Sequence, residues 1–261
     1  MQRMALATLL ALTTGGFALA EVKTETVSYT YDGATLKGFL AWDDSVSGKR
    51  PGVLVVHEWW GLNDYARKRA EMLAKLGYVA FACDMYGEGK VAAHPQEAGK
   101  FATAVRSNAK TWHGRAQAAL KVLQENDKVD PKRLAAIGYC FGGSTALQLA
   151  FTGADIKAAV SFHGALTPPT EEQAKAIKAK ILVCHGALDS FIPEKVCQEF
   201  RASLEKGNVD YQFIYYAGAR HGFTVEGAEK KMDGLAYNAN ADHRSWREMK
   251  ALFDEVFAAP K

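Results

Sequence analysis

The chain of 261 residues lacks a strong excess of charge, since 32 lysines and arginines stand against 29 aspartates and glutamates. A formal net charge of +3 is too small to indicate nucleic acid or an anionic membrane as a partner. After the first twenty residues no apolar run approaches the length of a membrane span, and we find no repeat, low-complexity tract or linker. With 48% hydrophobic and 23% charged residues, these absences favour one globular domain over residues 21–261.

The signatures of metal and dinucleotide binding are missing as well. Neither H-E-x-x-H nor C-x-x-C spacing occurs, and no second histidine follows His57 and Glu58 at helical spacing. No glycine-rich dinucleotide fingerprint follows the first predicted parallel strand. Because His163, His185 and His221 also lie near predicted strand ends, a metal hydrolase stays a weaker alternative. We expect an enzyme that uses neither a metal nor a cofactor.

Cysteine is scarce, with four residues in the whole chain. Cys83 and Cys184 lie in apolar strand-like runs, and Cys197 lies in an amphipathic helical stretch. Buried free cysteines behave as small hydrophobic residues, so these settings argue against a disulfide framework. Spacing alone does not determine whether any of the three is paired.

The first twenty residues differ from the rest of the chain. A basic start at Arg3 precedes an apolar stretch over residues 4–12, and the small residues Ala18 and Ala20 occupy the positions that a signal peptidase reads. The apolar stretch is too short and too interrupted for a membrane anchor. We therefore predict a cleaved signal peptide over residues 1–20, and export to the periplasm or the medium of a bacterium.

Strands alternate with helices along the remaining sequence. Alternating runs on both sides of Asp32-Gly33 predict a β-hairpin, and later apolar runs predict buried strands. Asn63 is placed to cap a helix, and the last helix carries apolar residues on one face up to Phe257. This order predicts an α/β fold with a mostly parallel sheet, helices on both faces and an antiparallel hairpin at its edge. The predicted strands are 26–31, 36–40, 52–56, 78–83, 134–138, 158–162, 180–184 and 211–215.

Cys140 lies where a predicted strand turns into a helix, in the motif Gly-Tyr-Cys-Phe-Gly-Gly at residues 138–143. This is a G-x-nucleophile-x-G elbow with cysteine in place of serine. Asp189 and His221 follow further strands, in the order nucleophile, acid, histidine that α/β-hydrolases use. In a parallel sheet the strand ends meet at one edge, so we predict a catalytic triad of these three residues.

A second motif, His-Glu-Trp-Trp-Gly at residues 57–61, directly follows a buried strand. This is where the fold places the second donor of an oxyanion hole, so the predicted donors are the backbone N–H groups of Trp59 and Phe141. Glu58 lies between His57 and two tryptophans, which favours a partly buried carboxylate close to Cys140. There it would control the charge of the thiol, although a surface carboxylate is the simpler alternative.

These motifs resemble the dienelactone hydrolase family of α/β-hydrolases over nearly the whole chain after residue 20. Further matches are Asp-Met-Tyr-Gly at 84–87, His-Gly-Ala-Leu-Asp at 185–189, His-Gly-Phe at 221–223 and Ala-Tyr-Asn at 236–238. The resemblance implies the α/β-hydrolase fold, a Cys140–His221–Asp189 triad and a Glu58 that helps to generate the thiolate. It also implies hydrolysis of a small-molecule ester or lactone without a metal, through a thioester intermediate. We expect the protein to be a monomer.

The chain departs from the family at two positions. Members that open dienelactones hold the substrate carboxylate with two arginines, but residues 86–90 and 221–226 contain none. Lys90 and Arg220 could replace them only by pointing inward. We therefore expect an aromatic, apolar pocket instead. Its predicted lining residues are Trp60, Tyr86, Tyr139, His163 and Phe223, beside Trp59.

Two alternatives remain open at this point. A general carboxylesterase or thioesterase would use the same triad on other substrates. A thiol-based sensor or binding protein on the same fold would show reversible oxidation of Cys140 and no turnover. Turnover of an ester distinguishes the first from the second.

Overall fold

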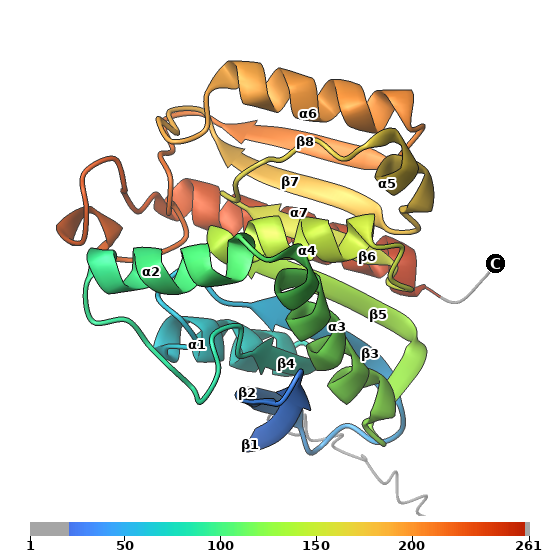
Figure 1. The fold of residues 1–261 in the computed structure, drawn as a ribbon. Helices are drawn as coiled ribbons and strands as arrows, with labels where there is room; N and C mark the ends of the chain where they lie inside the picture. Colours follow the sequence, from blue (N-terminus) through green and yellow to red (C-terminus); the bar gives the residue numbers. More distant parts are fainter. Residues whose placement is uncertain (1–20, 259–261) are drawn as a thin grey trace, which may run out of the picture.

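Eight strands form one sheet in the computed structural model, which describes residues 21–258 (Figure 1). The predicted signal peptide, residues 1–20, lies outside the described residues. The strands lie side by side in the order β1 (Val22–Tyr31), β2 (Ala34–Asp43), β4 (Val79–Cys83), β3 (Arg50–Val56), β5 (Val129–Tyr139), β6 (Ala158–Phe162), β7 (Lys180–Gly186) and β8 (Tyr211–Tyr216).

The antiparallel part of the sheet is confined to its N-terminal edge. β1 and β2 pair along their whole length around a turn at Asp32 and Gly33, both of which have positive φ, 49° and 76°. That geometry suits a tight hairpin, because it matches the twist of the two strands. β2 also pairs antiparallel with β4, and all remaining neighbours are parallel. The predicted α/β-hydrolase fold is confirmed.

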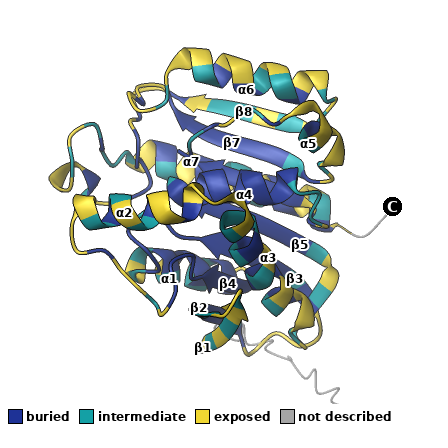
Figure 2. Ribbon diagram, in the orientation of Figure 1, coloured by how far each residue is buried: buried dark blue, intermediate teal, exposed yellow. Residues whose placement is uncertain are grey.

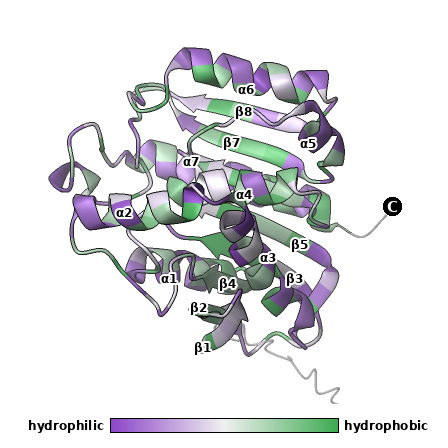
Figure 3. Ribbon diagram, in the orientation of Figure 1, coloured by the Kyte–Doolittle hydropathy of each residue, from purple (hydrophilic) through white to green (hydrophobic). Residues whose placement is uncertain are grey.

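Helices cover both faces of the sheet. α1 (Asp64–Ala74) and α7 (Ala239–Phe257) pack on one face, while α2 (Pro95–Arg106), α3 (Ala109–Glu125), α4 (Phe141–Phe151) and α6 (Glu194–Lys206) pack on the other. Figure 2 shows the central strands buried and the outer faces of the helices exposed. Figure 3 shows the matching division, with apolar strands between helices that are hydrophilic outside. Burial of both sheet faces explains the continuous apolar strand runs.

Two short helices complete the fold. α5 (Glu171–Ala176) precedes β7, and the 3-10 helix η1 (Ala228–Lys230) lies in the long connection between β8 and α7. The predicted helix start at Asn63 is confirmed, because its side chain accepts a hydrogen bond from the Ala66 N–H. All four cysteines lie within residues 21–258 and are free thiols. In the same residues no helix is both long and apolar enough to cross a membrane.

The parallel strands direct their carboxyl ends to one edge of the sheet. Glu58, Cys140, His163, Asp189 and His221 all lie in the segments that follow these ends. The sheet therefore brings together side chains that are up to 163 positions apart in the sequence.

Candidate active site

Cys140 occupies a sharp turn between β5 and α4. Its backbone has φ 51° and ψ −111°, a conformation that side-chain-bearing residues rarely adopt. The turn requires the neighbouring glycines: a Cβ on Gly138 would lie 2.0 Å from the Gly142 carbonyl oxygen, and one on Gly142 would lie 2.1 Å from the Val56 oxygen. The strain lifts Cys140 to the N-terminus of α4, whose partial positive charge stabilises an anion there.

His221 and Asp189 form a buried pair beside Cys140. His221 Nδ1–H donates to Asp189 Oδ2 over 2.8 Å, and the second Asp189 oxygen accepts from the Phe191 N–H over 2.9 Å. Burial lowers the pKa of His221, but the negative charges of Cys140 and Asp189 and their hydrogen bonds outweigh it and raise the pKa to about 10. An imidazolium at His221 is therefore favoured while the neighbouring sulfur carries negative charge.

Glu58 is a buried carboxylate in the same cavity. Only 6% of the residue is exposed, and its carboxylate makes no hydrogen bond or ion pair with other residues in the range 21–258. Burial raises its pKa to about 7, against the opposing effect of positive charge on His221, Lys231 and Arg69. Glu58 is thus poised to be half ionised near neutral pH, in the cavity that Cys140 also lines.

The side chains of His57 and Tyr86 hold the segment that carries Glu58 and Trp59. His57 Nε2 accepts from the Met85 N–H over 3.1 Å, so Nδ1 carries the proton and donates to the Glu58 carbonyl over 2.5 Å. Burial lowers the pKa of His57 to about 4, which keeps this ring neutral. Tyr86 Oη–H donates to the Trp59 carbonyl over 2.9 Å. Both bonds fix the orientation of the peptide groups around Trp59.

Two backbone N–H groups are available next to Cys140. Within the described part of the chain, neither the Trp59 nor the Phe141 N–H donates a backbone hydrogen bond, and Phe141 is the first residue of α4, where helical donors lack partners. Trp59 and Cys140 line one cavity. This arrangement of donors is suited to the oxyanion that forms on a carbonyl oxygen when a sulfur attacks the carbonyl carbon.

The cavity has a volume of about 200 Å³, and Glu58, Cys140 and His221 all line it. Its lining residues are Glu58, Trp59, Trp60, Arg106, Cys140, Ala165, Phe191, Ile192, His221, Gly222, Val225, Ala228, Lys231, Met232 and Leu235. The wall is mostly apolar, as the sequence indicates.

Four of the five predicted pocket residues lie elsewhere, and only Trp60 lines the cavity. Tyr139, His163 and Phe223 are fully buried on the side of the sheet covered by α1 and α7, where His163 packs against both aromatic rings. Tyr86 lies behind the wall and bonds to Trp59. The lining of this cavity therefore differs from the predicted one at these four residues.

Two cationic side chains at the cavity were missed by sequence reasoning. Arg106 at the end of α2 lies over the Phe141 ring at 5.0 Å, and Lys231 lies over the Trp60 ring at 5.1 Å. Neither forms an ion pair within residues 21–258. Lys90 and Arg220 are exposed and do not line the cavity. No spacing in the sequence marks Arg106 or Lys231, since each reaches the site only through the fold.

A metal centre finds no support in the side chains of the described range, residues 21–258. No group of three or more histidine, cysteine, aspartate or glutamate side chains there is arranged to hold a metal ion. His163 and His221 lie close together, but the partner of His163 is Thr224, whose oxygen lies 2.7 Å from Nε2.

Comparison with known proteins shows which family the chain resembles. The family model described as "Dienelactone hydrolase family" matches residues 36–257. "Protein usf" of Aquifex pyrophilus is 31% identical over 234 residues, which cover 88% of this chain and 97% of that protein. The solved structure named m3DLH is 41% identical, with a TM-score of 0.88 over 91% of this chain and 99% of that one.

A second solved structure is equally similar. It is described as a dienelactone hydrolase-like promiscuous phosphotriesterase from metagenomic libraries. It is 40% identical, with a TM-score of 0.88, and the match covers 90% of this chain and 98% of that chain.

Proposed function

The chain belongs to the dienelactone hydrolase family and is a hydrolase of lactone or ester bonds, and we propose that Cys140, His221 and Asp189 are its catalytic triad. The observation that carries the proposal is the buried His221–Asp189 hydrogen bond of 2.8 Å, because His221 lines the same cavity as Cys140 on its strained turn. This arrangement supports a site that contains a nucleophile, a base and an acid that orients the base.

The first half of the reaction forms a thioester. The Cys140 thiolate attacks the carbonyl carbon, and the carbonyl oxygen becomes an oxyanion that accepts from the Trp59 and Phe141 N–H groups. The intermediate collapses, the C–O bond to the leaving oxygen breaks, and that oxygen takes the proton of the His221 imidazolium. In a lactone the leaving oxygen stays attached to the acyl chain, so the ring opens.

The second half needs a neutral His221. Once Cys140 is acylated its negative charge is gone, and with it a main cause that raises the pKa of His221. The imidazole then takes a proton from water, whose oxygen attacks the thioester carbon. Collapse of the second intermediate releases the carboxylic acid and returns the Cys140 thiolate. The sum is addition of one water molecule to one ester bond.

Glu58 has a supporting role in this scheme. With a pKa of about 7 it exchanges its proton in the same pH range in which the thiol is needed as a thiolate. A proton on Glu58 removes a negative charge from the neighbourhood of the sulfur, which favours the thiolate and binding of an acyl group. Ionised Glu58 favours the neutral thiol, which protects the resting enzyme from oxidation.

Hydrolysis by purified residues 21–261 tests the triad. The panel holds short-chain aryl esters, a neutral lactone and an anionic dienelactone, assayed with the Cys140→Ala variant and with Cys197→Ala as the matched control. We expect Cys140→Ala to be inactive and Cys197→Ala to resemble the wild type, because Cys197 is buried in α6, away from the cavity. Acyl-enzyme trapped by acid quench should add the acyl mass to Cys140. Activity in Cys140→Ala refutes the proposal, and a fully reduced, inactive wild type supports the sensor alternative.

Hydrolysis of phosphotriesters is a second candidate activity. The 40% identical relative carries the name of a promiscuous phosphotriesterase. In this chain Arg106 and Lys231 provide positive charge at the cavity, which would stabilise charge developing on phosphoryl oxygens. An aryl dialkyl phosphate in the same panel tests this, with release of the phenol lost in Cys140→Ala as the expected result.

We also propose that residues 1–20 direct export and are removed. The basic start and the small residues at 18 and 20 support this. The N-terminus of protein recovered from the periplasm or medium of an expressing bacterium should be Glu21. An intact Met1 on all recovered protein contradicts it.

A further inference from the structure

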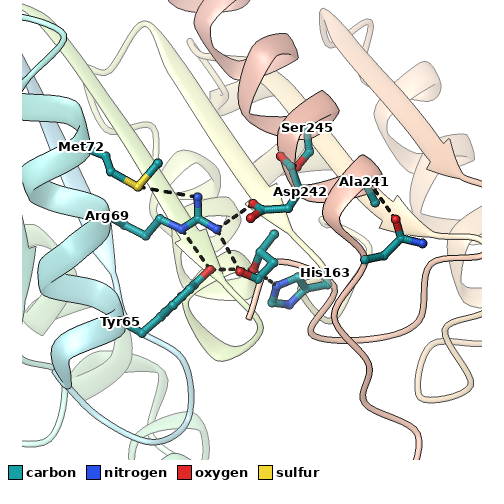
Figure 4. A network of polar contacts seen from close by, with 9 residues as sticks. Tyr65, Arg69, Met72, His163, Ala241, Asp242 and Ser245 are labelled. Carbon is teal, nitrogen blue, oxygen red and sulfur yellow. Dashed lines mark hydrogen bonds and ion pairs between the residues drawn. The ribbon is translucent and has the colours of Figure 1, made fainter. Parts of the chain in front are cut away.

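A largely buried polar network surrounds Arg69 and extends to His163 (Figure 4), whose ring packs against the ring of His221. We call it the Arg69 network; it consists of Tyr65, Arg69, His163, Thr224 and Asp242. The residues come from α1, the end of β6, the connection after β8, and α7. None of the five lines the cavity that holds Cys140, so the proposed reaction does not use them directly.

Thr224 is the centre of the network and lies three residues beyond His221. Its hydroxyl oxygen is 2.6 Å from Tyr65 Oη and 2.7 Å from His163 Nε2. Its backbone carbonyl accepts from Arg69 Nη2 over 2.9 Å. Both the side chain and the main chain of the segment after His221 are thus held by other elements.

Arg69 connects the network to α7 through Asp242. Its side chain is 7% exposed, and Nη2 donates to Asp242 Oδ1 over 2.6 Å. Its guanidinium also lies over the rings of Tyr65 and Tyr139, at 5.1 and 5.3 Å. A planar guanidinium held in this way has little freedom, so the groups bonded to it are fixed as well.

The protons in the network run in one direction. Arg69 Nε–H can only donate, so Tyr65 Oη accepts from it over 3.2 Å and donates its own proton to Thr224 Oγ1. The Thr224 hydroxyl is then left to donate to His163 Nε2. Burial, and after it the positive charges of His221 and Arg69, hold the pKa of His163 well below its usual range, which leaves Nε2 free to accept.

His163 connects the network to His221 through ring packing. The two rings meet edge to face with centroids 5.2 Å apart, and Phe191 packs on His221 at 5.2 Å as well. His163 itself has φ 42°, a strained conformation for its residue type. A neutral His163 supports the His221 ring without repelling the imidazolium.

We propose that Thr224 is a positioning residue for the catalytic base, which aligns His221 by tying its segment and its neighbour His163 to Tyr65 and Arg69. The inference rests on the proposed role of His221 and adds the part of the protein that holds it in place. Other titratable groups that act on His221 are Asp189, Cys140, Glu58 and His185. None of these contacts Thr224 through a hydrogen bond among residues 21–258.

The test compares Thr224→Val with Thr224→Ser. Valine keeps the shape and the backbone bond to Arg69 but removes the hydroxyl, whereas serine keeps the hydroxyl. We expect Thr224→Val to lower kcat about 10-fold to 100-fold with KM changed less than about twofold, because a small displacement of a catalytic group has this effect. Thr224→Ser should return kcat to within about threefold of the wild type. Thr152→Val, which removes a hydroxyl at the other end of α4, is the matched control.

A second readout does not depend on turnover. We expect iodoacetamide to alkylate Cys140 selectively, because the other three cysteines are buried. In Thr224→Val the pH at which alkylation reaches half of its maximal rate should be higher than in the wild type, since a misaligned imidazolium stabilises the thiolate less. Tyr65→Phe, which removes the hydroxyl bonded to Thr224, should shift it in the same direction. A loss of stability alone leaves this midpoint unchanged in the folded protein.

The outcomes separate the inference from the proposed function. If Thr224→Val matches the wild type in kcat and in the alkylation profile, or if Thr224→Ser is as impaired as Thr224→Val, the positioning role is wrong. If Cys140→Ala keeps its activity, the proposed triad is wrong, whatever Thr224 does. If Cys140→Ala loses its activity as expected while the Thr224 variants behave like the wild type, the Thr224 inference is wrong and the proposed triad stands.

Discussion

Replacing Glu58 by glutamine should make the protein more stable at alkaline pH and leave its stability unchanged in mild acid. The pKa of Glu58 lies at about 7 in the folded protein, against 4.5 for an exposed glutamate. The folded state therefore holds the proton more tightly than the unfolded chain between these values. Its stability falls as the pH rises from about 4.5 to 7, and above pH 7 the full loss is present.

The size of the effect follows from the shift. A difference from 4.5 to about 7 corresponds to about 3 kcal/mol of unfolding free energy at pH 8.5. Because Glu58 is buried with no partner in the described range, solvent screening does not reduce this much. Glutamine has the same shape and no charge, so Glu58→Gln should recover about 3 kcal/mol at pH 8.5, or roughly 6 °C or more in Tm.

Urea unfolding at pH 5 and pH 8.5 measures the difference, with Glu199→Gln on the exposed face of α6 as the control. At pH 5 the Glu58→Gln gain should shrink to less than about 1 kcal/mol, because the folded carboxyl is still protonated and pH 5 lies only about half a unit above the pKa of 4.5 in the unfolded chain. The same variant should lose activity, because the charge that governs the thiol is gone. An equal gain at both pH values, or no gain at pH 8.5, refutes the argument that Glu58 is a destabilising buried carboxylate.

Three further predictions concern the elbow, the charge of the substrate and the base. Gly142→Ala should cost about 3 kcal/mol of stability and abolish activity, because its Cβ meets the Val56 oxygen at 2.1 Å. The control is Gly99→Ala in α2, which has open space around it and should stabilise the protein by about 0.5 kcal/mol in urea unfolding. Arg106→Gln combined with Lys231→Gln should raise KM roughly tenfold for an anionic ester and leave a neutral ester unchanged, and equal effects on both esters contradict an electrostatic role. Asp189→Asn removes a hydrogen bond and a negative charge that raise the pKa of His221. We therefore expect kcat to fall roughly 10³-fold or more, and the pH above which His221 loses its proton to move downward. An unchanged pH–rate profile argues against the assignment of Asp189 as the acid of the triad.

The arrangement of strands could be predicted because each local pattern has one physical solution. The positive φ of Asp32 and Gly33 agrees with a hairpin expected from Asp-Gly between alternating runs. The apolar run at 52–56 is β3, buried on both faces between β4 and β5. What the sequence did not indicate is η1, whose three residues lie in a connection without a periodic pattern.

The candidate triad could be predicted because the motif and the fold depend on each other. An elbow with glycines at 138 and 142 works only at the end of a parallel strand, and parallel strands place their ends together. The wall of the cavity could not be predicted in this way. Whether Tyr86 faces substrate or bonds to Trp59 depends on the path of residues 84–94, which packing decides.

The sequence by itself determined which residues are candidates for the chemistry of this protein: a cysteine on a sharp turn, a histidine and an acid after successive strands, and a glutamate before two tryptophans. These residues are identified by motifs a few positions long, in which local backbone geometry limits the choice of amino acid. Only the tertiary structure decided how that chemistry is surrounded. It brought Arg106 and Lys231 to the cavity, turned Tyr139 and Phe223 away from it, and assembled the Arg69 network behind His221. The hydrogen bonds that Thr224 and Asp242 make in this network join residues 61 to 173 positions apart, and their geometry follows from packing between elements rather than from any pattern along the chain.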